Sequence, residues 1–176
     1  MLRECGALWL EEPFVPGALK AYRALAPRVA PVRLAGGEGR HTVHMALHML
    51  EHAGLGFIQI DAGRVGGISA AREVAAAADA AGVTFVNHTF TSHLALSASL
   101  QPYAGLAEHR ICEYPVELKP LASDMTASHL LPDEQGLVRY GQLFAVQPFG
   151  NSLVVRTYTG AQLQALLEQQ FDSGSN

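Results

Sequence analysis

The chain has 176 residues, of which 49% are hydrophobic and 16% are charged, and its formal net charge is −4. This balance is typical of a globular protein and excludes a disordered one. The negative charge also argues against binding to nucleic acid or to an anionic membrane. Cys5 and Cys112 lie far apart, which argues against a disulfide framework or a structural zinc site and favours the cytoplasm.

A strand, a loop and a helix recur about every 25 residues, the length of a βα unit with short connections. The predicted strands are nearly continuous apolar runs, as in parallel sheets that are covered on both faces. Predicted strands are residues 7–11, 32–35, 56–61, 83–87 and 110–113, and predicted helices are 16–26, 42–53, 69–81 and 92–100. The pattern therefore predicts an α/β fold with about five parallel strands.

Acidic or histidine side chains stand at the ends of four successive apolar runs, each just before a loop. They are Glu11, Glu38, Asp61 and His88. Because the carboxyl ends of parallel strands meet at one edge, we expect these side chains to face a common site. Taken singly, each could be a helix cap, a solvent-facing carboxylate or a structural histidine; the recurrence favours an enzyme site.

The residue types suggest two different roles, metal binding and proton removal. Carboxylates such as Glu11 and Glu38 are the hard oxygen ligands that Mg²⁺ prefers. A carboxylate beside an imidazole fixes the ring tautomer and raises its basicity, so Asp61 with His88 could act as a general base that removes a proton from carbon.

Five segments resemble the enolase superfamily, in its mandelate racemase and muconate lactonizing enzyme branch. They are WLEEP, AGGEG, IQIDAGRVGGIS, NHTFTSHLALSASL and CEYP, in the family's order. The resemblance implies a partial (β/α) TIM-type barrel. It further implies that Glu11 and Glu38 are two of three magnesium ligands, that His88 is the base with Asp61 as its partner, and that Glu113 is an acid near the substrate carboxylate.

The same resemblance implies magnesium-dependent removal of the proton alpha to a carboxylate, most simply in an acid-sugar dehydratase, a lyase acting on a small sugar acid. In that family a third metal ligand and a Lys-x-Lys pair precede the strand that ends at Glu11, whereas ten residues precede Glu11 here. The alternative is therefore an inactive truncated or fused fragment. Open barrel edges would then favour self-association or a homo-oligomer.

The C-terminal tail, residues 140–176, does not continue the βα pattern and resembles a second family. Its segment GQLFAVQPFGNSLVVRTYTGAQLQALLEQQF resembles part of the C-terminal domain of bacterial 5′-nucleotidases. That resemblance implies that Phe149 stacks on a base and that Asn151 makes a polar contact. We expect two parts, residues 1–139 as a partial barrel and 140–176 as a short α+β tail with a helix over 160–171.

Three histidines recur at helical i, i+4 spacing within the predicted helix 42–53. They are His44, His48 and His52, which would share one face. Such a face could bind a transition metal, but the favoured interpretation is an outer barrel helix that faces solvent.

Overall fold

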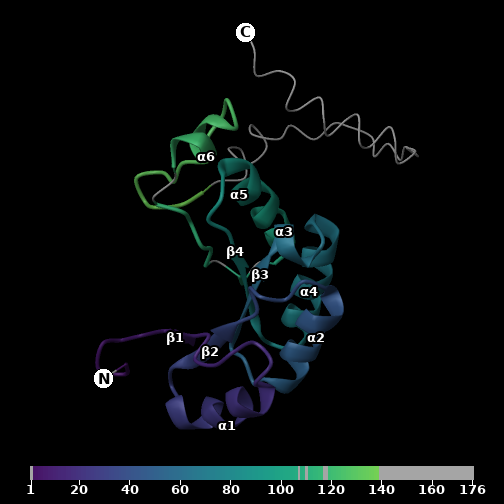
Figure 1. Cartoon of the computed structure of the whole chain (residues 1–176). Coiled ribbons are helices and arrows are strands. Elements are labelled where there is room, and N and C mark those ends of the chain that lie inside the picture. The colour runs from purple at the N-terminus through teal and green to yellow at the C-terminus, as the bar shows by residue number, and fades with distance from the viewer. Residues whose placement is uncertain (1, 107, 110, 117–118, 139–176) are drawn as a thin grey trace, which may run out of the picture.

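The computed structural model of the chain describes residues 2–106, 108–109, 111–116 and 119–138. Within them lies a four-stranded sheet with the order β1-β2-β3-β4, in which every neighbouring pair is parallel (Figure 1). The strands are β1 (Trp9–Glu11), β2 (Arg33–Gly36), β3 (Phe57–Asp61) and β4 (Thr84–His88). Four of the predicted strands and the parallel α/β class are thus confirmed.

Helices alternate with the strands, and α2 and α4 lie side by side along one face of the sheet (Figure 1). The helices are α1 (Leu19–Val29), α2 (Val43–His52), α3 (Ala62–Val65), α4 (Ile68–Ala80), α5 (His93–Leu100), the 3₁₀ helix η1 (Gln101–Tyr103) and α6 (Pro120–Asp124). The sequence pattern missed α3, because a single turn has no apolar periodicity. The first helix was expected at 16–26, but it starts after Gly17 and retains Pro27 in its last turn.

Local hydrogen bonds explain where three of the helices begin. Thr42 Oγ1 accepts the Met45 N–H at 3.2 Å, and Ser92 Oγ accepts the Ala95 N–H at 3.2 Å. Asp61 Oδ1 accepts the N–H groups of Gly63 and Arg64 at 2.8 and 3.1 Å. Such caps satisfy amide groups that have no partner inside the helix. The Asp61 cap turns the chain into α3 directly at the end of β3.

The predicted fifth strand at 110–113 is not a regular strand, although its described residues lie beside β4. The Asn87 side chain holds it there, because Asn87 Oδ1 accepts the Glu113 N–H at 2.9 Å and Asn87 Nδ2 donates to the Glu113 carbonyl at 3.1 Å. A side-chain amide thus replaces the backbone ladder that sequence reasoning expected.

Alternation along the strands divides the buried residues between the two faces of the sheet. On the helix-covered face, Ile58 and Ile60 pack with Leu34, Met49 and Phe85 in the main core. On the opposite face, a smaller cluster unites three strands and contains Ala35, Phe57 and Val86, with Trp9 and Ile111 packed against it. Because both faces of β3 are buried, its continuous apolar run in the sequence is explained.

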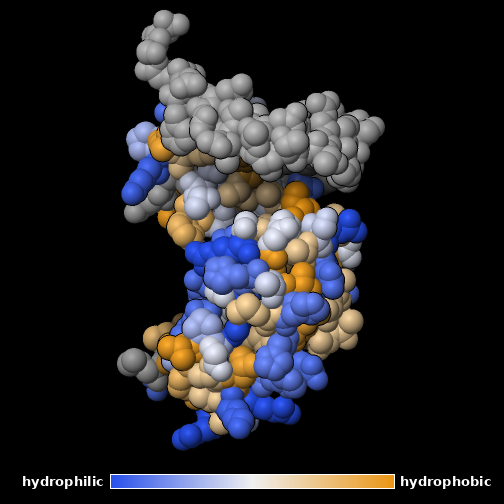
Figure 2. Space-filling model, turned by 45° about the vertical axis from the view of Figure 1, so that its right-hand side comes forward, coloured by the Kyte–Doolittle hydropathy of each residue, from blue (hydrophilic) through white to orange (hydrophobic). Residues whose placement is uncertain are grey.

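The described surface is mixed in character. Figure 2 shows hydrophilic and hydrophobic residues interspersed, with mainly hydrophilic ones along the concave edge midway up the molecule. None of the helices in the described ranges is long and apolar enough to cross a bilayer. The tail expectations, including Phe149, Asn151 and the helix 160–171, fall outside the described residues.

Candidate active site

His88 lies between two carboxylates at the carboxyl end of the sheet. Its Nδ1 is 3.0 Å from Asp61 Oδ2, and its Nε2 is 2.8 Å from Glu38 Oε2. Asp61 and His88 are register partners on β3 and β4, so the parallel pairing itself brings them together. A neutral imidazole can donate to one carboxylate, and the doubly protonated ring can donate to both. The arrangement therefore fixes the orientation of the ring between two acceptors.

Arg64 joins the two carboxylates from the first turn of α3. Its Nη1 lies 3.4 Å from Glu38 Oε1, and its Nε lies 3.6 Å from Asp61 Oδ2. The guanidinium also lies 5.7 Å from the centre of the Phe90 ring. This positive charge offsets repulsion between the two carboxylates that flank His88. Sequence analysis missed Arg64, although its place three residues after Asp61 was a usable signal.

Glu113 enters the site from the segment that follows η1. Gln59 Nε2 donates to Glu113 Oε1 at 2.6 Å. Burial raises the pKa of the Glu113 carboxyl above its usual range; the nearby Glu11 charge adds to the rise, while the Gln59 hydrogen bond and His88 oppose it. A carboxyl with a raised pKa keeps its proton to higher pH and can donate it. Gln59, fully buried in the middle of β3, was not singled out from the sequence.

A buried polar network fixes the backbone that carries Glu113. Besides bonding residue 113, Asn87 Nδ2 donates to Ser99 Oγ at 3.0 Å. Tyr103 accepts the Asn87 N–H at 2.9 Å, and its hydroxyl donates to the Ile111 carbonyl at 2.7 Å. Burial raises the pKa of Tyr103, so its hydroxyl stays protonated and remains a donor. Asn87, next to His88 in the chain, has a structural role that sequence analysis did not recognise.

Glu11 occupies the expected rim position but has a different partner. It ends β1, its side chain is exposed, and its Oε2 accepts the Trp9 indole N–H at 3.1 Å. Glu11 and Glu38 are magnesium-compatible in kind, because both offer carboxylate oxygen. Across the described part of the chain, however, no group of three or more His, Cys, Asp or Glu side chains could hold a metal. The role of Glu11 and Glu38 as magnesium ligands therefore stays a prediction.

A small cavity lies beside the Asp61–His88 pair. Its volume is about 180 Å³. Asp61, His88 and Thr89 form one side, and small residues from α3, α5 and the turn before α4 form the rest, namely Ala62, Gly63, Gly67, Ala95, Ala98 and Ser99, together with Ile68. The small side chains leave this space open, next to the group that could remove a proton.

Comparison with known proteins places this geometry in a family context. Residues 1–143 match the family described as enolase C-terminal domain-like, and residues 121–176 match the 5′-nucleotidase C-terminal domain. The two matches overlap over residues 121–143, so the boundary expected at 139/140 stays a prediction. Most of the second match lies outside the described residues.

Individual relatives point the same way. A protein of Caldivirga maquilingensis, provisionally named L-rhamnonate dehydratase, is 33% identical over 106 residues, which are 58% of this chain and 27% of the relative. The D-galactarolactone cycloisomerase of Agrobacterium fabrum is 31% identical over 112 residues, 64% of this chain and 29% of the relative.

A solved structure has a similar fold over most of the chain. The crystal structure described as a predicted mandelate racemase from Rhodobacter sphaeroides has a TM-score of 0.74 and 50% identity, and the match covers 92% of this chain and 43% of that one. The chain thus spans less than a third of the curated relatives and less than half of this neighbour. With its parallel sheet, its rim carboxylates and its family match, the chain belongs to the enolase C-terminal domain-like family, in the mandelate racemase branch of the enolase superfamily.

Proposed function

We propose that this chain carries the proton-transfer half of an active site that removes the proton alpha to the carboxylate of a sugar acid, in dehydratase-like chemistry. The observation that carries the proposal is His88, held between Asp61 and Glu38 with its two ring nitrogens 3.0 and 2.8 Å from their carboxylates. The names of the relatives, a dehydratase and a cycloisomerase of sugar-derived acids, support the substrate class.

His88 is the base in the proposed reaction. Asp61 holds the N–H at Nδ1, which leaves Nε2 to accept the alpha proton once the Glu38 carboxylate has turned away from Nε2 toward its proposed ligand position. The C–H electron pair moves into the carboxylate and forms an enediolate. In dehydration, the enediolate collapses and expels the beta hydroxyl, which leaves as water with the proton that His88 returns to it, and the resulting enol tautomerises to the 2-keto-3-deoxy acid.

Glu113 is the proposed acid of the site. Its raised pKa favours the protonated form, which can donate a hydrogen bond to the substrate carboxylate as negative charge develops there. Gln59 fixes the carboxyl group, and Asn87 fixes its backbone. These contacts reduce the reorganisation needed when charge appears.

Magnesium is the proposed cofactor. Glu11 and Glu38 would be its ligands from this chain, and the bound ion would supply positive charge to stabilise the enediolate. Further ligands would come from polypeptide other than the described residues, since these contain no three-residue cluster that could hold a metal.

A second candidate is a catalytically inactive fragment that keeps the family's residues without turnover. One observation favours it: within the described residues, no group of three or more His, Cys, Asp or Glu side chains could hold a metal ion. In this case β1, an edge strand of the sheet within the described residues, would pair with another molecule, and we would expect homo-oligomers by light scattering. The nucleoside-binding tail with Phe149 and Asn151 stays a weaker proposal, which adenosine titration of Phe149→Ala would test.

The decisive experiment follows alpha-proton exchange of a panel of sugar acids in D₂O with Mg²⁺, by proton NMR. The Agrobacterium cycloisomerase serves as the intact positive control, and His88→Asn serves as the matched negative control. Exchange in the parent that His88→Asn abolishes supports the proposal. No exchange in the parent, with exchange in the control enzyme, refutes autonomous activity and favours the inactive fragment.

A further inference from the structure

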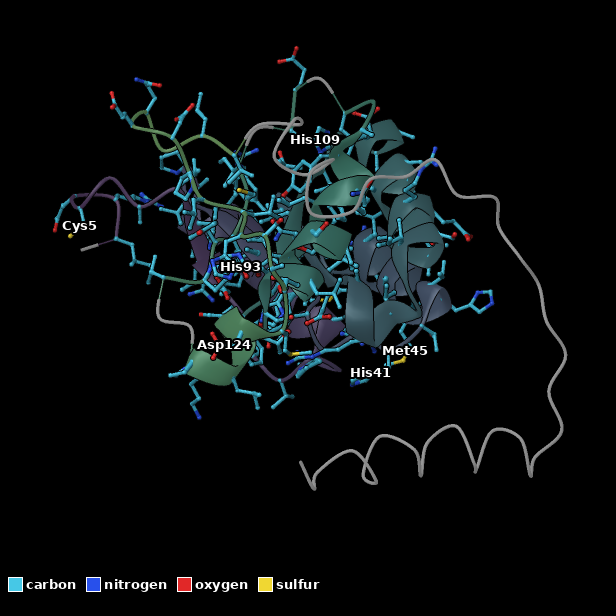
Figure 3. The ribbon with its side chains drawn as sticks, turned by 90° about the horizontal axis from the view of Figure 1, so that it is seen from above. Cys5, His41, Met45, His93, His109 and Asp124 are labelled. Carbon is cyan, nitrogen blue, oxygen red and sulfur yellow. The ribbon has the colours of Figure 1, made fainter. Side chains whose placement is uncertain are left out.

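The C-terminal half of α2 brings two imidazoles together outside the candidate active site. His48 and His52 lie one helical turn apart, with ring centres 4.6 Å from each other and ring planes at 80°. The His48 side chain is exposed, and that of His52 is 42% exposed. Figure 3 shows Met45, in the first turn of α2, and His41, just before that helix, at the edge of the ribbon.

Both rings line one groove against the start of α1. The groove has a volume of about 560 Å³, and its opposite wall is Gly17–Ala21. Neither imidazole takes part in a hydrogen bond within the part of the chain that the structure describes; the nearest ionic neighbour of His52 is Glu51, whose Oε2 lies 3.8 Å from His52 Nε2. Apart from the 3.8 Å approach of Glu51 to His52, neither ring has a described polar partner.

This arrangement matches what borderline divalent metals need. Neutral imidazoles suit Cu²⁺, Ni²⁺ and Zn²⁺, whereas Mg²⁺ prefers carboxylate and water oxygen. Histidines at i and i+4 on one helix face can bind a single ion together. The Glu51 carboxylate and the carbonyl end of α2, where His52 lies in the last turn, both add negative potential. Lys20, on the opposite wall of the groove, opposes them.

We propose that His48 and His52 form a two-imidazole chelating site for a divalent transition-metal ion, with water completing the coordination. The site is separate from the rim carboxylates, because it lies on α2 and not at the carboxyl ends of the strands. It differs from the interpretation favoured from the sequence, in which this helix face is only solvated. The pair is His48 with His52, and not His44 with His48, because only the former rings contact each other and share the groove.

Three single variants of the untagged full-length chain test the assignment: His44→Asn, His48→Asn and His52→Asn. His48→Asn removes both i, i+4 pairs, His52→Asn removes the proposed pair, and His44→Asn removes the other one. Isothermal titration with CuCl₂ and then ZnCl₂ at neutral pH should give one saturable site. Because the second imidazole binds intramolecularly, affinity should fall by about tenfold or more in His48→Asn and His52→Asn and change less than about twofold in His44→Asn.

Circular dichroism of each variant should match that of the parent, since the altered side chains lie on the surface of α2. Millimolar Mg²⁺ should not displace the bound Zn²⁺. Absence of saturable Cu²⁺ binding would overturn the proposal, and so would undiminished affinity in His52→Asn. Loss of affinity in His44→Asn with full affinity in His52→Asn would move the site to the other pair and refute the assignment.

Discussion

Asp61 and His88 are register partners on neighbouring parallel strands, and the Asp61 Oδ2 atom lies 3.0 Å from His88 Nδ1. The other carboxylate oxygen of Asp61 caps α3 by accepting two backbone N–H groups. One side chain therefore both starts a helix and orients the candidate base. These two roles can be separated by mutation.

Asp61→Asn should reduce alpha-proton exchange by about 100-fold or more, because the amide cannot stabilise a protonated His88 as a carboxylate does. It should leave stability nearly unchanged, since Asn is also a good helix N-cap. Asp61→Ala should lose the same activity and about 1 kcal/mol of unfolding free energy as well. NMR exchange rates and urea unfolding measure the two effects. Full exchange activity in Asp61→Asn would contradict the assigned role.

Magnesium should raise the melting temperature only slightly. If the described carboxylates bind Mg²⁺ with a Kd in the millimolar range, 10 mM Mg²⁺ would add on the order of 1 kcal/mol to the unfolding free energy. Glu38→Gln should abolish that rise, because it removes one of the two carboxylate ligands. Differential scanning calorimetry with and without Mg²⁺ makes the comparison. An equal rise in parent and Glu38→Gln would mean that the ion binds elsewhere.

Asn87→Ala should destabilise the chain by about 3 kcal/mol or more. The change removes hydrogen bonds to Ser99 and to both backbone groups of Glu113, and it leaves buried polar groups without partners. Tyr103→Phe, which removes only a hydroxyl from the same network, should cost less, about 1–2 kcal/mol. Urea denaturation gives both values. A loss below about 1 kcal/mol in Asn87→Ala would show that the 111–113 segment is held by other contacts.

Stability should fall as the pH drops below the ordinary histidine pKa, in part because of His93. This side chain, labelled near the middle of the view in Figure 3, is buried, and its Nδ1 accepts the Leu130 N–H at 3.2 Å. Burial lowers the His93 pKa, and His129, whose ring stacks on it at 4.6 Å, lowers it further. A lowered pKa means that His93 binds a proton more readily in the unfolded chain than in the folded one. The contribution of neutral His93 to the unfolding free energy is therefore fully present above about pH 6.5 and is lost as the pH falls below it.

The His93 contribution can be isolated with His93→Gln, whose amide oxygen can still accept the Leu130 N–H but does not titrate. Unfolding free energies of parent and variant are compared between pH 7.5 and 5.5. The variant should lose less stability over this range. Equal losses would show that other groups cause the pH dependence.

Much of the scaffold could be predicted from local sequence. Continuous apolar runs identified four parallel strands. A strand that is covered on both faces has apolar residues on both sides, so its sequence does not alternate between apolar and polar residues. The rim residues were also recognisable, since parallel strands place their carboxyl ends at one edge. Helix starts were harder: the first helix begins three residues later than expected, after Gly17, and it tolerates Pro27 in its last turn.

Contacts between distant segments could not be predicted from these local patterns. The sequence by itself predicted that Glu11, Glu38, Asp61 and His88 would lie at one edge of a sheet, because each follows the apolar run of its own βα unit. In the structure Glu38, Asp61 and His88 make contact, whereas Glu11 bonds Trp9. Only the tertiary structure decided that Arg64 bridges the two carboxylates, that Gln59 and Asn87 hold Glu113, and that the 111–113 segment pairs through a side chain. Gln59 and Glu113 lie 54 residues apart, and a one-dimensional pattern of polarity carries no signal for such a contact. Only the i, i+3 spacing of Asp61 and Arg64 was visible locally.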